Sequence, residues 1–179
     1  GEPLMRPGFI QLVRMLAQVE GIDDISLTSN GTMLSKYAVE LKEAGLKRVN
    51  ISLDTLKEER FRQIAGRDKL GDVFSGIEAA YDAGLEPVKI NMVVMRGIND
   101  DEILDFAQKS VTEGWHVRFI EFMPFGTPVA ETLETVPTRE IQESIQSLGR
   151  LEPYTGPTGN GPARYYRFPG ARGTIGFIT

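Results

Sequence analysis

The sequence contains no cysteine and only one histidine among its 179 residues. Without cysteine the chain holds no disulfide, no thiolate nucleophile and no cysteine-bound metal cluster. The single histidine, His116, lies beside Trp115 just before an apolar run, and we interpret it as structural. A histidine-based catalytic triad or metal site is therefore excluded for this chain.

Long apolar runs and an excess of positive charge are also absent. No stretch approaches the roughly 20 apolar residues that span a bilayer, and no signal-peptide pattern precedes Gly1. The formal net charge of -5 argues against general nucleic-acid binding, so an anionic ligand would have to meet a focused site. We expect a cytoplasmic protein that partners neither a membrane nor a nucleic acid.

The composition is that of a globular domain, with 41% hydrophobic and 25% charged residues. The chain begins abruptly at Gly1-Glu2-Pro3 and finishes on the apolar residues 176–179. We interpret this as the interior of a longer protein.

One pattern recurs four times along the chain: a helical segment, a glycine that ends it, and an apolar, β-branched run. The glycines are Gly21, Gly45, Gly84 and Gly114, and the predicted strands lie near residues 24–30, 48–54, 88–94 and 117–122. The apolar helix faces are Phe9, Leu12, Val13 and Leu16; Leu34, Ala38 and Leu41; Val73, Ile77, Ala80 and Tyr81; and Ile103, Phe106 and Ala107. Repeated βα units predict parallel strands, in a doubly wound sheet or a (β/α) barrel.

Polar side chains on one face of three predicted strands favour the barrel. They are Ser26, Thr28 and Asn30, then Asn50, Ser52 and Asp54, then Lys89 and Asn91. Strands of a doubly wound sheet are covered on both faces and read as nearly continuous apolar runs. The intervening helices disfavour an antiparallel sheet with one wet face. Four strands are too few to close a barrel of eight, so we predict an α/β fold that is a partial TIM-type (β/α) barrel with a polar lumen.

The repeated helix–glycine–strand pattern stops after Met123. A loop leads to a short amphipathic helix that we expect Thr138 to cap, with Glu140 and Ile141 in its first turn. A Gly- and Pro-rich segment follows, with β-prone pieces at residues 163–168 and 174–179 that we predict to form hairpin-like strands packed on the barrel. We therefore expect a partial barrel over residues 1–123 and the start of a small α+β extension over residues 124–179.

Five segments, in order and spacing, resemble the GTP 3′,8-cyclase (MoaA) family of radical S-adenosylmethionine enzymes. They are "GEPLMRPG", "SLTSNG", "VNISLDTL", "PVKINMVVMRGINDDEI" and "VRFIEFMPFG". The motif "GEP" alone is weak, and "VKINMVVMRGINDDE" with "RFIEFMP" is the specific signal. The resemblance covers essentially the whole chain and implies a barrel of the radical S-adenosylmethionine kind. It also implies that residues 124–179 begin the truncated C-terminal molybdenum cofactor synthesis domain.

The resemblance implies that the parent protein is a lyase-type radical enzyme. In this family a 5′-deoxyadenosyl radical from S-adenosylmethionine converts GTP to 3′,8-cyclo-7,8-dihydro-GTP, an early step of molybdenum-cofactor biosynthesis. The family carries two [4Fe-4S] clusters, held by cysteines upstream of the Gly-Gly-Glu-Pro motif and beyond the "GFIT" strand. Both cysteine motifs are missing here, so we expect this chain by itself to hold no cluster, to retain no catalytic residue and to be inactive. Expected partners are GTP and the downstream cyclic pyranopterin monophosphate synthase, and a homodimer is left open.

The resemblance also assigns ligand-binding residues. S-adenosylmethionine would be bound by Gly1, Glu2, Ser52, Arg118 and Met123, and GTP by Thr28 and Lys89. The residues by themselves leave simpler roles open: a turn at Gly1–Pro3, a local backbone hydrogen bond for Ser52, a surface arginine on a strand edge, and core filling by Met123.

Lys89 is the most informative of these residues on physical grounds. It lies in a run too apolar for a surface strand, and a buried ammonium is costly unless an anion meets it. That anion is the GTP phosphate by the resemblance, or a structural carboxylate such as Asp54 or Glu121. Asn91 shares the face of Lys89 and is a weaker candidate for nucleotide contact.

Acidic residues at 100–102 suggest a metal site, but we interpret them as the acidic first turn of a helix. Two other functions stay open for the whole protein. One is a non-catalytic nucleotide- or phosphate-binding (β/α) barrel that never carried a cluster. The other is a different radical enzyme, such as one acting on a peptide, which we do not expect to share "VKINMVVMRG".

Overall fold

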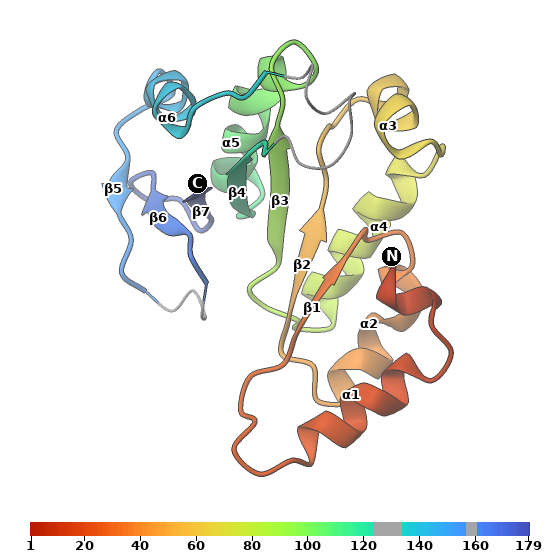
Figure 1. Ribbon diagram of the computed structural model, residues 1–179. Helices are drawn as coiled ribbons and strands as arrows, with labels where there is room; N and C mark the ends of the chain where they lie inside the picture. The colour runs from red at the N-terminus through yellow and green to blue at the C-terminus, as the bar shows by residue number, and fades with distance from the viewer. Residues whose placement is uncertain (124–133, 157–160) are drawn as a thin grey trace. The chain divides into compact units, whose positions relative to one another are not determined.

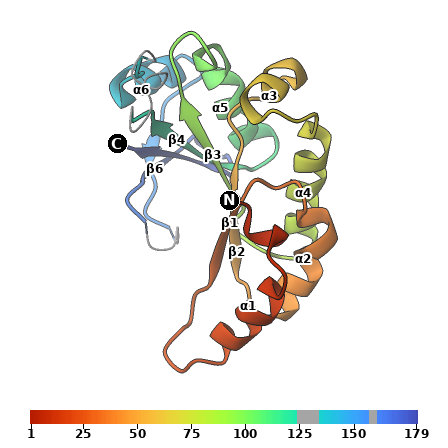
Figure 2. The same ribbon diagram turned by 45° about the vertical axis from the view of Figure 1, so that its right-hand side comes forward.

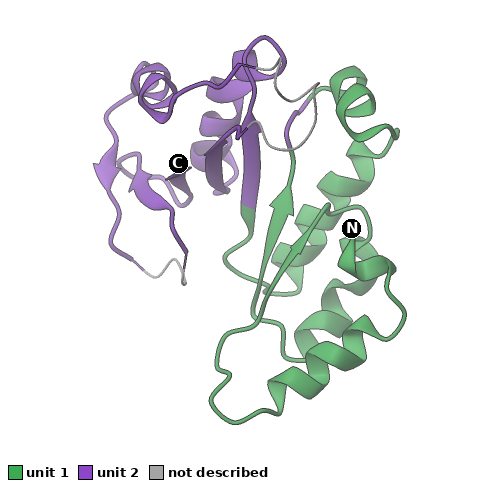
Figure 3. Ribbon diagram, in the orientation of Figure 1, with its two compact units in different colours: residues 1–53, 57–89 green, residues 54–56, 90–179 purple. Residues whose placement is uncertain are grey.

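The computed structural model describes residues 1–123, 134–156 and 161–179. They belong to two compact units, shown in Figure 3: residues 1–53 with 57–89 form unit 1, and residues 54–56 with the described part of 90–179 form unit 2. Both units combine helices with strands, and the predicted α/β fold class is confirmed. The domain boundary at residue 123 stays a prediction.

Unit 1 is built from βα units, as the glycine-punctuated pattern predicts. Its elements are η1 (Pro3–Met5), α1 (Phe9–Ala17), β1 (Ser26–Ser29), α2 (Leu34–Glu43), β2 (Arg48–Ser52), α3 (Glu58–Ala65) and α4 (Leu70–Asp82). Strands β1 and β2 pair in parallel, with Ser26 opposite Arg48. Figures 1 and 2 show α1, α2 and α4 on the same side of these strands.

The predicted apolar faces of α2 and α4 form the core of unit 1. Leu34, Ala38 and Leu41 of α2 are buried, as are Val73, Ile77 and Ala80 of α4. The prediction for α1 is wrong in part: Val13 is buried, but Leu12 and Leu16 remain 41% and 38% exposed. An apolar periodicity therefore does not by itself bury a helix face.

Unit 2 contains the remaining strands. Its elements are β3 (Lys89–Val94, with Lys89 counted in unit 1), η2 (Asp100–Glu102), α5 (Ile103–Thr112), β4 (His116–Glu121), α6 (Thr138–Gln146), β5 (Glu152–Pro153), β6 (Arg164–Arg167) and β7 (Thr174–Ile178). Along the sheet the order is β3, β4, β7, β6, β5. Strand β7 is parallel to β4 and antiparallel to β6, and β6 is antiparallel to β5.

The last strands correct one expectation. Strands β6 and β7 are antiparallel neighbours, as predicted, but they do not pack on the barrel as a separate layer. Instead β7 hydrogen-bonds to β4 and extends the same sheet. A strand as buried as β7 needs partners for its backbone groups along both edges, and β4 and β6 provide them. The rings of Phe119 on β4 and Phe177 on β7 stack with centroids 6.1 Å apart.

The start of α6 also differs from the expectation. The position before the helix is Pro137, and Thr138 is its first residue, so Thr138 does not cap the helix with its side chain. The cap comes from a distant residue: the backbone N–H of Thr138 donates to the Glu121 carboxylate. Ile141 is fully buried and Glu140 lies in the first turn, as predicted. Among the described residues no helix has the length and apolar character needed to cross a membrane.

Candidate functional site

The carboxyl end of β1 meets the Gly1-Glu2-Pro3 segment. The Glu2 carboxylate accepts hydrogen bonds from the Ser29 hydroxyl at 2.8 Å, the Asn30 backbone N–H at 2.7 Å and the Leu4 backbone N–H at 3.2 Å. The third bond makes Glu2 the cap of η1. Gly1 is exposed, with open space where a side chain would stand. In place of a turn at Gly1–Pro3, the 3-10 helix η1 begins at Pro3, and Glu2 fixes its start to the strand.

The polar face predicted for β1 and β2 exists within unit 1. The Asn50 side-chain amide donates to Thr28 Oγ1 at 3.2 Å, which places these two side chains on the same face. Thr28 and Ser52 are both exposed, whereas Leu27 and Ile51 point into the helix-covered core. The local backbone hydrogen bond considered for Ser52 is not found among the described residues. Two hydroxyl-bearing residues of the predicted site thus face away from the core.

Lys89 is buried, as the sequence predicts. Only 2% of the residue is exposed, at the first position of β3. The two carboxylates proposed as its structural partners each bind a backbone amide: Asp54 accepts from Val93 N–H at 2.8 Å, and Glu121 accepts from Thr138 N–H. Burial raises the pKa of the Asp54 carboxyl, and the bond from Val93 offsets this only in part.

In unit 2, Arg118 is held on a central strand. Strand β4 lies between β3 and β7, so the alternative of a surface arginine on a strand edge is wrong. The Arg118 Nε donates to Asn91 Oδ1 at 2.7 Å, so Asn91 orients the guanidinium. Met123 is 56% exposed, so it does not fill the core.

The acidic run at residues 100–102 has a structural role. These residues form η2, before α5 begins, and not the first turn of the α-helix itself. Glu102 is fully buried and accepts from Thr55 Oγ1 at 2.6 Å and from the Leu56 N–H at 2.7 Å. This carboxylate therefore anchors the loop that follows β2.

The donor set does not fit a metal or an iron-sulfur cluster. Within the described ranges no group of three or more His, Cys, Asp or Glu side chains could hold a metal ion. The chain has no cysteine to hold a [4Fe-4S] cluster. His116 Nδ1 pairs with Thr174 Oγ1 at 2.9 Å across β4 and β7, which supports its structural interpretation.

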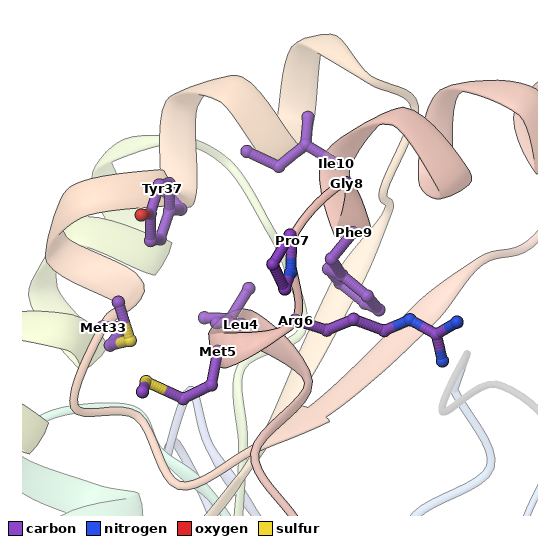
Figure 4. A pocket seen from close by; sticks show the side chains of 9 residues that line it. All are labelled: Leu4, Met5, Arg6, Pro7, Gly8, Phe9, Ile10, Met33 and Tyr37. Carbon is purple, nitrogen blue, oxygen red and sulfur yellow. The ribbon is translucent and has the colours of Figure 1, made fainter.

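Pockets open on unit 1, and two of them lie near its first residues. Figure 4 shows the first, of about 370 Å³, where Tyr37 of α2 and Met33, just before that helix, face residues 4–10. No predicted site residue lines this pocket. The second, of about 510 Å³, is lined by Glu2 and by Asn30, which follows β1, together with Phe61, Arg67 and Lys69. Of the predicted site residues, only Glu2 lines either pocket.

Sequence reasoning misses two supporting positions. Ser29 lies among residues of mixed character and does not stand out, although a buried serine with the parity of apolar Leu27 signals a specific partner. Gly176 is hidden within a Gly-rich segment. It lies opposite Arg118, and its missing side chain leaves room for the arginine and for Tyr165.

Known families and proteins of similar sequence were compared with this chain. Residues 1–109 match the model of the Radical SAM superfamily. The chain is 53% identical over 179 residues to a GTP 3′,8-cyclase of Moorella thermoacetica, which covers all of this chain and 55% of that protein. It is 48% identical over 181 residues to a GTP 3′,8-cyclase of Pelotomaculum thermopropionicum. That match covers 100% of this chain and 56% of the relative. The chain thus spans about half the length of the curated relatives it matches.

A solved structure supports the fold. A domain of pyruvate-formate lyase-activating enzyme from Bacteroides vulgatus superposes with a TM-score of 0.62 at 19% identity. The match covers 83% of this chain and 88% of that domain. At this identity the likeness concerns the fold alone.

Proposed function

We propose that this chain, which belongs to the radical SAM superfamily, is the interior part of a GTP 3′,8-cyclase of molybdenum-cofactor biosynthesis. The observation that carries the proposal is the 53% identity to a GTP 3′,8-cyclase along the full length of the chain. The relatives are longer, so the activity belongs to a longer protein that contains these residues. Residues 1–123 then form part of its barrel, and residues 124–179 begin its C-terminal domain.

Residues of both units are assigned to ligand binding. In unit 1, Gly1, Glu2 and Ser52 serve S-adenosylmethionine, while Thr28 and Lys89 serve GTP. In unit 2, Arg118 and Met123 serve S-adenosylmethionine. The exposed hydroxyl groups, the buried ammonium and the guanidinium oriented by Asn91 support these roles.

The chemistry of the longer protein depends on [4Fe-4S] clusters, which supply the electron that generates the radical. No residue of this chain can hold one, because the sequence has no cysteine. What these residues do is bind and orient the two ligands. The chain by itself is inactive under this proposal.

The partners follow from the same proposal. GTP is the substrate, and the product passes to a cyclic pyranopterin monophosphate synthase in the cytoplasm. Homodimer formation is tested separately, by light scattering on the longer protein.

The assignment of Lys89 gives the proposal its sharpest test. In the longer protein, Lys89→Ala should weaken GTP binding, because a charge-assisted phosphate contact contributes about 1.5 to 3 kcal/mol, or roughly tenfold to a hundredfold in affinity. The exposed Lys47 is the matched control, and Lys47→Ala should leave GTP affinity unchanged. Calorimetry measures GTP affinity, and absorbance measures cluster content.

Cluster content and S-adenosylmethionine affinity should survive in Lys89→Ala, since this lysine is assigned to the other ligand. Unchanged GTP affinity in a protein with a loaded cluster would show that Lys89 is a structural ion-pair partner. A longer protein that binds neither GTP nor S-adenosylmethionine would refute the proposed function itself.

A further inference from the structure

The Glu2 carboxylate is already engaged by the protein. Three donors surround it: the Ser29 hydroxyl and the Leu4 N–H on Oε1, and the Asn30 N–H on Oε2. We infer that Glu2 is a positioning residue, which fastens the Gly1–Pro3 segment to the end of β1 and leaves cofactor contact to the backbone of that segment. This inference rests on the proposed function and revises the role of one of its residues.

The direction of Ser29 supports this role. Successive side chains of a strand point to opposite faces, so Ser29 points away from the face that carries Thr28. Burial agrees: Ser29 is 3% exposed and has the parity of Leu27, while Thr28 is exposed. A carboxylate that binds the Ser29 hydroxyl is thereby drawn toward the helix-covered side. It is not directed onto the polar face shared by Thr28 and Asn50.

The chemistry of the three partners explains why the side chain is a carboxylate. All three groups are donors, and an ionised carboxylate is the side chain that only accepts. Glutamine has the same shape, but its amide nitrogen is a donor and would oppose one of the three. Hydrogen bonds to an ionised acceptor are also stronger than neutral ones.

Ser29 extends the connection into the loop that starts α2. Its hydroxyl donates to Glu2 and accepts from the Gly31 N–H at 3.0 Å. Glu2, Ser29 and Gly31 therefore form one continuous chain of hydrogen bonds. Through it the position of Gly1 is set by β1 and not by the cofactor, and the open surroundings of Gly1 leave its backbone accessible.

The test relies on Ser29, which under this inference has no direct contact with the cofactor. In the longer protein we compare Ser29→Ala, Glu2→Gln and the double variant, with Ser26→Ala as the matched control. Ser26 is an exposed serine of the same strand with the opposite parity. The measurements are S-adenosylmethionine affinity, GTP affinity and hydrogen exchange of the Asn30 N–H, on variants shown to be folded by circular dichroism.

Ser29→Ala should weaken S-adenosylmethionine affinity about threefold to tenfold, as expected for the loss of one buried hydrogen bond. GTP affinity should change less than about twofold by comparison. Glu2→Gln should weaken cofactor affinity at least as much and speed exchange at Asn30. The double variant should be no worse than Glu2→Gln, because both substitutions break the same connection. Ser26→Ala should match the wild type.

Full cofactor affinity in Ser29→Ala beside a loss in Glu2→Gln would overturn the inference, since Glu2 would then contact the cofactor itself. Additive losses in the double variant would overturn it for the same reason. If Glu2→Gln does not fold, Ser29→Ala decides alone. Failure of the proposed function is distinguishable, because the wild-type longer protein would then bind no S-adenosylmethionine.

Discussion

Individual side chains of the candidate site are held in place by neighbouring residues. Arg118 is held from one side by Asn91, whose Oδ1 accepts from Nε at 2.7 Å. On the other side it lies opposite Gly176 of β7, with Tyr165 of β6 opposite the same glycine. A Cβ at Gly176 would stand 2.9 Å from the Tyr165 ring and 3.1 Å from Arg118 Cγ. The absence of a side chain here lets both of its neighbours keep their places.

Gly176→Ala should therefore displace Arg118 or Tyr165. Overpacking of this kind costs about 1 to 3 kcal/mol of unfolding free energy. In the longer protein it should also weaken S-adenosylmethionine affinity, because the proposed carboxylate contact of Arg118 moves. Urea denaturation and calorimetry measure the two effects. Gly161→Ala, at a glycine with open space around it, is the control, and equal behaviour of the two variants would contradict the prediction.

Among the elements, α4 approaches the loop between β1 and α2 unusually closely. A Cβ on Gly76 of α4 would stand 2.2 Å from the Gly31 carbonyl oxygen and 3.2 Å from Leu34 Cβ. Gly31 itself has a φ of +80°, a backbone conformation that favours glycine. Two glycines from different elements thus allow α2 and α4 to pack their apolar faces together.

Gly76→Ala should destabilise the chain even though alanine is the better helix former. A backbone carbonyl cannot move aside as a flexible side chain can, so we expect a loss of about 1 to 3 kcal/mol, measured by urea denaturation. Gly71 lies in the same helix with nothing within 4 Å of its Cβ position. Gly71→Ala should instead stabilise the chain by up to about 1 kcal/mol. A gain in Gly76→Ala equal to that of the control would show that the helices can separate at little cost.

For the whole molecule, the half-buried Asp54 carboxyl links stability to pH. Burial raises its pKa above the ordinary aspartate value, so the folded chain holds this proton more tightly than the unfolded chain. Asp54 makes its full contribution to the free energy of unfolding below the ordinary aspartate pKa. That contribution is lost as the pH rises through the raised pKa of the folded chain. Charging Asp54 in the folded chain therefore opposes folding toward neutral pH.

Asp54→Asn should remove this part of the pH dependence. The asparagine side-chain oxygen can still accept from the Val93 N–H, while the charge is gone. The free energy of unfolding of the variant, relative to the wild type, should rise between about pH 4 and pH 7. Urea denaturation across that range measures it, with Asp23→Asn at an exposed position as the control. A difference that does not vary with pH would contradict the role of Asp54.

The sequence alone determined the features that depend on local pattern. Glycines ending helices, β-branched runs and period-two polarity predicted the four strands that became β1 to β4, and the apolar faces of α2, α4 and α5. The same pattern predicted that Lys89 would be buried. The absence of cysteine excluded a cysteine-bound cluster on composition alone. These inferences succeed because the periods of strands and helices appear as patterns of apolar and polar residues that are close together in the sequence.

Only the tertiary structure decided the features that depend on which distant residues meet. It placed β7 beside β4, exchanged the expected Thr138 cap for the Glu121 carboxylate, and left Leu12 and Leu16 of α1 exposed. It also gave Glu2 two of its three partners, Ser29 and Asn30, which are 27 and 28 residues away along the chain. A hydrogen bond or a buried face is completed by a partner, and the identity of that partner is fixed by packing across the fold and not by the neighbouring sequence.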